Sequence, residues 1–272
     1  MKELTVEELR QVQIDLLNHF DEKCRENGLT YSLCGGTLIG AVRHKGYIPW
    51  DDDIDVMMPR PDYEKFLRLS FPAPYLLQAP ELLSKEQEYV YIYAKLMNTD
   101  TILIEDPDGK CLKSHVYMDI FPLDAIADDE ETFAKEFRQI HKCVRYNYIL
   151  EESDSVRKIR GLSLLRKIKW NFAYLGRCIL PVRYFYYKAI RLVKHRDYGS
   201  ARYLGHPLSE PRPAYRYPRE IMVMDNHVLF EGREYSAMHD YKEFLRIHYG
   251  DYMQLPPVEE RLPHDNIAYK KD

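Results

Sequence analysis

Apolar positions in the first part of the chain change from helical to strand spacing. Behind a capping box at Thr5 and Glu8, apolar residues recur every three or four positions until Gly28, which predicts an N-terminal helix. The residues of this apolar stripe are Leu9, Val12, Leu16 and Phe20. Apolar runs at 31–34 and 54–58 then enclose a diglycine turn and a short helical pattern, so we expect strand, turn, helix and strand.

Three further runs favour strands, at residues 89–96, 101–105 and 116–121. The turn signal Asp106-Pro107-Asp108-Gly109 stands between the last two. Together with the N-terminal elements, these runs predict a mixed α/β (α+β) sheet core of about 125 residues.

The remaining patterns are mostly helical. We expect helices at 129–151 and 240–249, and two more within 157–196 that are separated at Pro181. Residues 200–218 favour an extended loop, and 221–230 favour a hairpin around Asp225-Asn226.

No internal repeat or linker divides the chain. The patterns predict one compact unit with a catalytic core at 1–125, a basic helical lobe at 126–200 and a C-terminal segment, 201–272, that packs on the core.

Composition adds a setting. With 272 residues and 45% hydrophobic content, the chain is long enough for a substantial core. The five cysteines are odd in number and form no C-x-x-C pair, and Met1 opens directly into the helix without a signal peptide. These features predict a reduced, cytoplasmic protein, peripheral at most, because no apolar stretch approaches the length of a membrane span.

The net charge of −4 conceals a segregation of sign. Residues 157–196 hold twelve Lys and Arg and no acid, which leaves 27 basic against 43 acidic residues, or −16, elsewhere. Aromatic and aliphatic residues fill the same block, a combination that suits an anionic membrane surface better than nucleic acid. The ordinary alternative is a helical bundle whose basic face binds the acidic remainder of the protein.

The diglycine is the first candidate for ligand binding. Gly35, Gly36 and Thr37 stand at a strand-to-helix turn, where backbone N–H groups and the helix dipole favour an anion such as a phosphate. Alone, the same residues are typical of a tight bend.

The acidic run that follows indicates a metal. Asp51, Asp53 and Asp55 are spaced by two, so we expect them on one face of a strand, where like charges need a cation between them. Oxygen ligands of this kind suit Mg²⁺ or Mn²⁺. A solvated loop, a calcium loop and a helix cap are the alternatives. The apolar residues next to the acids disfavour a solvated loop. Val56 occupies the position where a calcium loop needs glycine, and two prolines separate the acids from the helix that they would cap.

A further carboxylate is expected to join this set. Asp119 is the one acid in an apolar strand-like run, and a buried acid is rare unless it is paired or coordinates a cation. Asp124 is second choice, since it follows Pro122 and fits a turn or cap.

Four basic residues are candidates for phosphate contacts. Lys95 stands alone in an apolar run and needs a partner. Arg43, His44 and Lys45 lie between the diglycine and the acids, although they equally suit a solvated helix end.

These motifs, above all 35–37, 43–55 and 117–120, resemble the LicD family of phosphocholine and related phosphotransferases, a branch of the nucleotidyltransferase superfamily that includes fukutin-related proteins. The resemblance returns at 230–232 and 249–257. The Cys-rich zinc site of fukutin-related enzymes has no counterpart among these residues, so zinc is not expected.

The resemblance implies a nucleotidyltransferase-like core and a CDP-linked alcohol donor, most often CDP-choline. The acceptor would be a hydroxyl of a teichoic acid or surface glycan precursor. Asp53, Asp55 and Asp119 would be catalytic and would hold the metal with Asp51, and Asp119 would also act as general base. Gly35, Gly36, Thr37, Lys95 and residues 43–45 would bind the donor.

Two alternatives remain from the sequence. One is a nucleotidyltransferase that moves a nucleoside monophosphate to a small molecule, protein or RNA. The other is a non-catalytic membrane-surface adaptor, which the clustered, mutually repelling acids disfavour.

Overall fold

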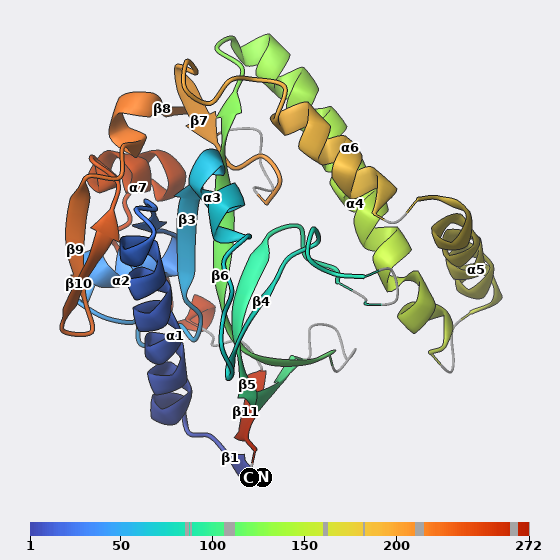
Figure 1. Cartoon of the computed structure of the whole chain (residues 1–272), viewed down its shortest axis with the longest axis horizontal. Coiled ribbons are helices and arrows are strands. Elements are labelled where there is room, and N and C mark those ends of the chain that lie inside the picture. The colour runs from blue at the N-terminus through green and yellow to red at the C-terminus, as the bar shows by residue number, and fades with distance from the viewer. Residues whose placement is uncertain are drawn as a thin grey trace. The chain divides into compact units, whose positions relative to one another are not determined.

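A computed structural model describes residues 1–84, 87, 89–105, 112–159, 163–181, 183–209, 215–261 and 266–271 (Figure 1). The chain divides into two compact units. The first contains residues 1–78, 94–123 and 217–272, and the second contains 79–93 and 124–216.

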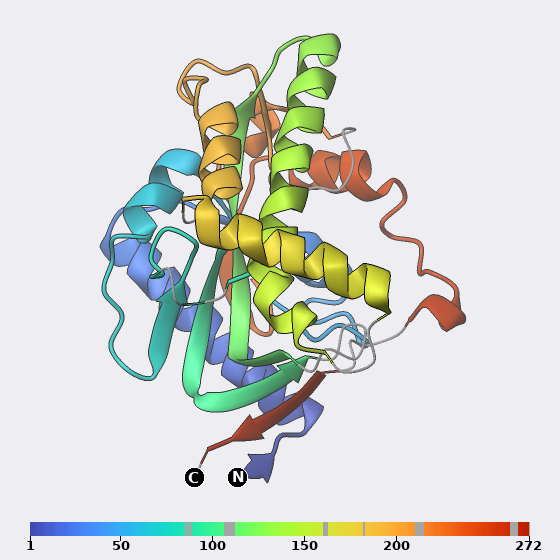
Figure 2. The ribbon, with the colours of Figure 1, turned by 90° about the vertical axis from the view of Figure 1, so that its right-hand side faces the viewer.

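A mixed sheet forms the centre of the first unit (Figures 1 and 2). Its strands follow the order β1-β11-β5-β6-β3-β2, and β4 also pairs with β5. Among the described pairings of this unit's sheet, only β3 with β6 is parallel. The bounds are β1 Lys2–Glu3, β2 Ser32–Leu33, β3 Asp55–Pro59, β4 Tyr75–Gln78, β5 Ala94–Glu105, β6 Leu112–Ile126 and β11 Asn266–Lys270.

Helices pack on this sheet through their apolar stripes. In α1 (Val6–Glu26) the capping box is formed as expected: Thr5 accepts from the Glu8 amide, and the Glu8 carboxylate accepts from the Thr5 amide. Phe20 of α1 is fully buried, with its ring 5.0 Å from Phe66. The other helices are α2 (Gly35–Arg43), α3 (Arg60–Phe66) and α7 (Tyr241–Tyr249), with 3₁₀ turns η2 (Arg219–Met222) and η3 (Val258–Glu260). The prediction of a mixed α/β fold is confirmed.

The strands around residues 89–105 differ from the prediction. Instead of two strands, β5 is one strand whose register shifts between Asn98 and Leu103. Residues 89–93 lie outside it and belong to the second unit. They are apolar for another reason: Ile92 is buried in a cluster with Ile140 and Tyr186. The predicted turn at 106–109 lies outside the described residues.

The C-terminal hairpin also forms at a different place. Strands β9 (Asn226–Phe230) and β10 (Arg233–Ala237) pair around Glu231 and Gly232, so the expected turn at Asp225-Asn226 is wrong. Both turn residues have positive φ, 47° and 79°, which is the geometry that a two-residue hairpin turn requires.

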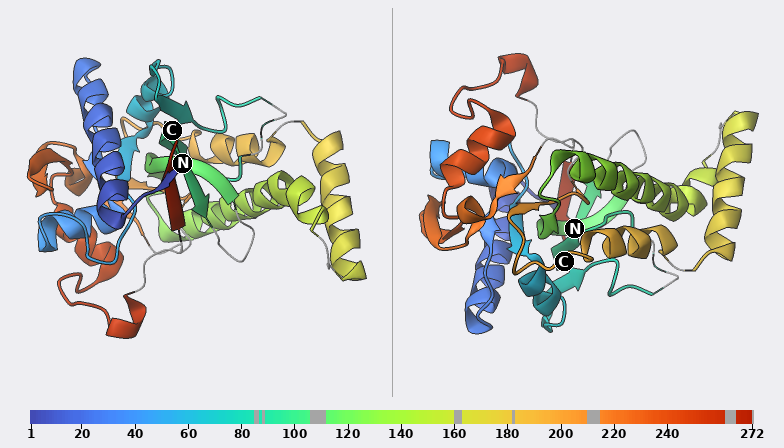
Figure 3. Two further views of the ribbon diagram at one scale, coloured as in Figure 1. Left: turned by 90° about the horizontal axis from the view of Figure 1, so that it is seen from below. Right: turned by 90° about the horizontal axis from the view of Figure 1, so that it is seen from above.

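Helices dominate the second unit: α4 (Glu130–Arg157), α5 (Leu164–Ile179) and α6 (Tyr184–Val193). The expected helix at 129–151 therefore runs six residues further, and Pro181 separates the next two as predicted. Figure 3 shows α4 and α6 side by side, with α5 lying across one end of the pair.

The segment expected as an extended loop carries two short strands, β7 (Tyr203–Gly205) and β8 (Tyr217–Pro218). β7 pairs with residues 124–126 at the end of β6. Asp124 is thus a buried strand residue, and its expected place in a turn or cap is wrong. In the part of the chain that the structure describes, no helix has the length and apolar character needed to cross a bilayer.

Candidate active site

Strand register brings three of the predicted residues together in the first unit. Asp55 of β3 is the parallel partner of Asp119 in β6, and Asp119 is the antiparallel partner of Lys95 in β5. Since directly paired residues point to the same face of a sheet, the three side chains lie next to one another on adjacent strands. The Asp119 amide donates to the Ile54 carbonyl at 2.8 Å, so the pairing extends one residue before β3.

Lys95 has its charge partner inside the protein. Its ammonium forms an ion pair with the Asp119 carboxylate, with 2.7 Å between Nζ and Oδ1. The same Nζ lies 3.2 Å from the ring centroid of Tyr117, and Lys95 is fully buried. The Tyr117 hydroxyl donates to Glu105 at 2.6 Å. The lone lysine of this apolar run therefore neutralises a neighbouring acid in the structure.

Asp51 and Asp53 are placed differently from the prediction. The expectation that the three acids line one strand face is wrong, because β3 begins only at Asp55 and residues 51–54 form a loop. Ile54 of this loop is fully buried, so a buried residue beside the acids does not by itself indicate a strand.

Helix α1 holds this loop through backbone carbonyls. One guanidinium nitrogen of Arg10 donates to the carbonyls of Ile48, Pro49 and Asp51, at 3.2, 3.0 and 2.7 Å. Gln13, which is buried, donates from Nε2 to the Asp52 carbonyl at 2.6 Å. These bonds fix the backbone from which the acids project. The sequence did not identify either residue. The one indication that it offers is that both are polar and lie close to the apolar stripe of α1.

The β9–β10 turn holds the preceding segment. The Tyr47 amide donates to the Glu231 carboxylate at 3.0 Å, and the Glu231 amide donates to the Lys45 carbonyl at 3.0 Å. A Cβ on Gly46 would lie 2.0 Å from Glu231 Oε1, so the contact requires glycine at that position. The Phe230-Glu231-Gly232 motif therefore positions the loop that leads to the acids.

The diglycine lies directly against the acids. Gly35 and Gly36 are the first two residues of α2, and added Cβ atoms would lie 2.3 Å from the carboxylates of Asp55 and Asp51 respectively. Gly35 also has φ of +57°, which favours glycine. Thr37 is buried, and its hydroxyl accepts from the Asp55 amide at 2.9 Å. The N-terminus of α2 and the acids thus form one site.

The carboxylates perturb one another. Burial raises the pKa of Asp55 well above its usual range, and the negative charges of Asp53, Asp119 and Asp51 raise it further. Burial also raises the pKa of Asp119, to about 6, although the charge and hydrogen bond of Lys95 oppose the rise. Lys95 offers one positive charge to four acids, so the site favours an additional cation.

The acids are not arranged as a finished coordination shell. Among the described residues, no three Asp, Glu, His or Cys side chains converge tightly enough to enclose a metal ion as they stand. Asp51 and Asp53 would have to move to complete such a shell, and a loop permits this more readily than a strand.

Arg43, His44 and Lys45 follow at the end of α2. The Arg43 guanidinium donates to the carbonyls of Tyr252 and Gln254, at 2.8 and 3.4 Å, and to His44 Nε2 at 2.9 Å. Burial lowers the pKa of both Arg43 and His44. Lys45 is exposed and has positive φ. Arg43 therefore ties the C-terminal motif at 249–257 to the segment before the acids.

A sheet that carries clustered acids beside a glycine-rich helix start defines a nucleotidyltransferase-like enzyme class. Residues 28–152 match the family model described as the LicD/FKTN/FKRP nucleotidyltransferase domain. The chain is 34% identical, over an alignment of 281 positions that covers 97% of each protein, to the lipopolysaccharide cholinephosphotransferase LicD of Haemophilus influenzae. The chain belongs to the LicD family, and the prediction of a LicD-type transferase is confirmed.

Two more distant relatives share only part of the chain. An uncharacterised protein of Rickettsia typhi is 27% identical over 123 residues, 45% of this chain and 38% of that protein. One of Rickettsia prowazekii is 27% identical over 124 residues, 45% of each.

Proposed function

We propose that this enzyme transfers phosphocholine from CDP-choline to a hydroxyl of a cell-surface glycan precursor. The observation that carries the proposal is the similarity to the Haemophilus cholinephosphotransferase, because it extends over nearly the whole of both chains. The acidic site, with its buried Asp119–Lys95 pair, supports the same chemistry.

The transfer is a displacement at phosphorus. The acceptor hydroxyl oxygen bonds to the phosphorus that carries choline, the bond between that phosphorus and the bridging oxygen of the diphosphate breaks, and CMP leaves. The hydroxyl proton passes to Asp119. A base works best when its pKa is near the working pH, and the pKa of Asp119, about 6, leaves it largely ionised at neutral pH.

Lys95 acts through Asp119 in this proposal. Its ammonium opposes the effect of burial and so holds the carboxylate in the ionised form that accepts a proton. Bound between Asp119 and the Tyr117 ring, it is a positioning residue. A direct contact to a donor phosphate, as predicted from the sequence, would require it to leave that position.

The residues fit a divalent ion by charge. Asp53, Asp55 and Asp119 would hold Mg²⁺ or Mn²⁺, with Asp51 as an additional ligand, and the ion would neutralise the diphosphate of the donor. The observations behind this assignment are the pairing of Asp55 with Asp119 and the raised pKa of Asp55, which burial and the neighbouring acids both cause. Zinc is not part of the proposal.

The donor diphosphate would lie at the start of α2. Gly35 and Gly36 have no side chains of their own to cover their backbone N–H groups, and no side chain caps α2 through these groups. Thr37 supports the site by binding the Asp55 amide. Arg43, His44 and Lys45 are proposed to contact the donor or the acceptor's phosphates from the other end of α2.

The donor and acceptor are tested separately. Thermal shift with CDP-choline, CDP-ribitol, CTP and ATP, each with Mg²⁺, should show the largest stabilisation with CDP-choline. Choline transfer should then be measured with a lipopolysaccharide acceptor and with a teichoic acid precursor. A shift with CTP or ATP alone, followed by labelling of an acceptor with the nucleoside monophosphate, would establish a nucleotidyltransferase instead.

A non-catalytic role makes the opposite prediction. Calorimetric titration without any Mg²⁺-dependent nucleotide binding would favour the adaptor hypothesis.

We also propose that the enzyme associates peripherally with an anionic membrane through residues 157–196, where a lipid-linked acceptor would be met.

A further inference from the structure

Helix α5 exposes an unusual amount of apolar surface. None of its sixteen residues is buried, although half of them are large and apolar. Leu164, Leu165, Phe172 and Ile179 each leave 72–79% of their surface exposed. Short helices are marginal in water and usually depend on a packed apolar face, so α5 needs a partner for this surface.

These residues lie on one face of the helix. The outer stripe of α5, as we name it, recurs at intervals of three and four positions, which places its members along one side. Its members are Leu164, Leu165, Ile168, Phe172, Leu175 and Ile179. Trp170, Tyr174 and Arg177 fall on the opposite side and are half-buried. The outer stripe therefore points away from the side that touches α4.

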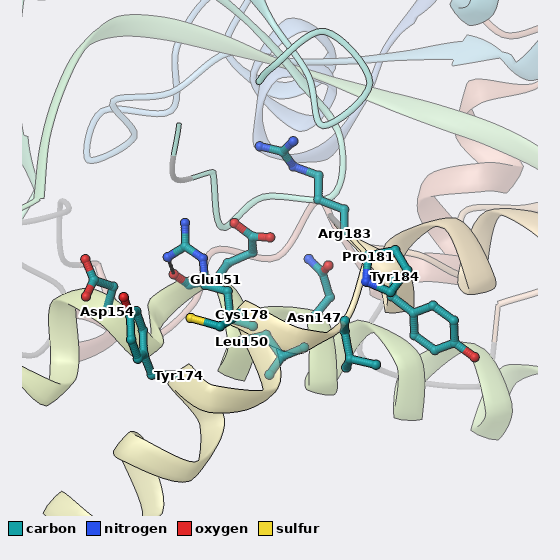
Figure 4. Close-up of a pocket in the computed structure, with 11 residues that line it drawn as sticks. Asn147, Leu150, Glu151, Asp154, Tyr174, Cys178, Pro181, Arg183 and Tyr184 are labelled. Carbon is teal, nitrogen blue, oxygen red and sulfur yellow. Dashed lines mark hydrogen bonds between the residues drawn. The ribbon is translucent and has the colours of Figure 1, made fainter. Parts of the chain in front are cut away.

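The inner side of α5 rests on α4. Arg177 donates to the Glu151 carbonyl at 3.2 Å, and the Arg157 guanidinium lies 3.8 Å from the Tyr174 ring centroid. Figure 4 shows Tyr174 and Cys178 of α5 beside Asn147 and Glu151 of α4, around a cavity of about 330 Å³. An incompletely filled inner side does not compensate for the exposed outer stripe.

Two groups of basic residues in this region differ in their partners. Arg157 and Lys158 pair with Asp154, and Arg196 pairs with Glu136, so these cations are neutralised within the second unit. Arg183 donates to the carbonyls of Leu83 and Gln87.

The cations of α5 form the other group. Arg166, Lys167 and Lys169 are exposed, and among the described residues none of them forms an ion pair. Arg166 and Lys167 also stand near the N-terminal end of the helix, where cations oppose the helix dipole. An anionic surface would offset this unfavourable arrangement.

We propose that α5 is an in-plane membrane helix. Its outer stripe enters the acyl boundary of an anionic bilayer, and Lys167 and Lys169, on the two flanks of the stripe, contact the lipid phosphates. Charge complementarity favours this occupant over a second copy of the chain, since two such helices face to face would bring their cations together. The inference rests on the peripheral membrane association proposed above, which it assigns to one helix, and it does not depend on the transfer reaction.

Vesicle sedimentation with the full-length protein tests the proposal without nucleotide. The probes are vesicles of phosphatidylcholine alone and vesicles in which about a quarter of the lipid is phosphatidylglycerol. Wild type should bind the anionic vesicles and release as salt rises. Phe172→Asp with Ile179→Asp should weaken binding by roughly tenfold or more, because two charges replace inserted apolar side chains. The matched control, Val258→Asp, changes an equally exposed apolar residue of η3 and should bind like wild type.

Two further variants keep the result interpretable. Phe172→Ser with Ile179→Ser should weaken binding in the same direction but less, and circular dichroism should show both pairs folded. Lys167→Glu with Lys169→Glu should remove the preference for anionic lipid.

Binding by the Asp pair equal to wild type would overturn the proposal. A second outcome would also overturn it: wild type sediments as a dimer, the Asp pair sediments as a monomer, and vesicle binding is the same for both. A second copy of the chain would then cover the outer stripe.

Discussion

Lys95 and Asp119 face each other across the β5–β6 pairing and form a buried ion pair, with 2.7 Å between Nζ and Oδ1. Asp55 is the neighbour of Asp119 on the other side. Asp119 thus has a cation on one side and a second acid on the other.

Removing Lys95 should make stability depend on pH. Burial raises the pKa of Asp119 to about 6 even with Lys95 present, and loss of the ammonium should raise it further. A raised carboxyl pKa means that the folded state binds more protons than the unfolded state, so stability falls as pH rises. Lys95→Met should therefore cost about 3–5 kcal/mol at pH 8, the range for breaking a buried ion pair, and clearly less at pH 5.

Urea unfolding at the two pH values measures this difference. Lys45→Met, which removes an exposed lysine, serves as control and should change stability little. The double variant Lys95→Met/Asp119→Asn should recover much of the loss at pH 8. A loss that is equal at both pH values would show that Lys95 matters for packing alone.

Asp53→Asn and Asp55→Asn should abolish transfer while the protein stays folded. In the metal-free protein at pH 8, Asp55→Asn should be as stable as wild type or slightly more stable, because it removes a carboxylate whose pKa is raised by burial and by repulsion from the neighbouring acids. Added Mg²⁺ should raise the melting temperature of wild type more than that of either variant. Activity within about tenfold of wild type would refute the metal assignment, since a lost ligand should cost more than that.

Asp119→Asn should lower turnover by at least roughly a hundredfold, the loss expected when a general base is removed. Donor affinity should change less, and calorimetric titration with CDP-choline can measure it. The assay temperature must lie well below melting, because the variant leaves Lys95 without its carboxylate. A variant that turns over normally but binds donor weakly would make Asp119 a binding residue.

Gly35→Ala should damage the site more than the fold. Alanine at a left-handed φ costs on the order of 1–2 kcal/mol. Gly28, with φ of +62° and no atom within 4 Å of an added Cβ, shares this cost. At Gly35 the same Cβ also lies 2.3 Å from Asp55 Oδ2, so the carboxylate must move.

Comparing the two alanine variants separates the effects. Gly28→Ala should lose stability and keep its activity in conditions where it is folded, whereas Gly35→Ala should lose both. Equal activity in the two variants would mean that Asp55 tolerates displacement.

Local sequence signals predicted much of the fold. The capping box at Thr5 and Glu8, the apolar stripe of α1 and the break at Pro181 all depend on residues a few positions apart. The motifs around the acids also indicated the LicD family, which is confirmed, whereas the role of the individual acids stays a prediction.

Signals that depend on distant contacts were not readable. The bond from Tyr47 to Glu231 joins residues 184 positions apart, and no periodicity records it. Residues 89–93 resemble a strand in sequence, but they are apolar because Ile92 packs against helices of the second unit. The loop at 51–54 resembles the start of a strand because its last residue, Ile54, is buried next to the strand residues Val56 and Met57 of the same sequence run. The spacing of apolar residues indicates which residues are buried, and only indirectly whether the backbone there is a helix, a strand or a loop.

The order of the segments along the chain has a consequence for biosynthesis. The first unit needs residues after 217, which supply β11 and the Glu231 contact to Tyr47, whereas every residue of the second unit precedes them. When the second unit has been synthesised, Arg10 and Gln13 can already hold the acidic loop, but the contact between Tyr47 and Glu231 cannot yet form. The nascent enzyme acquires its complete site only after Glu231 and β11 have been synthesised.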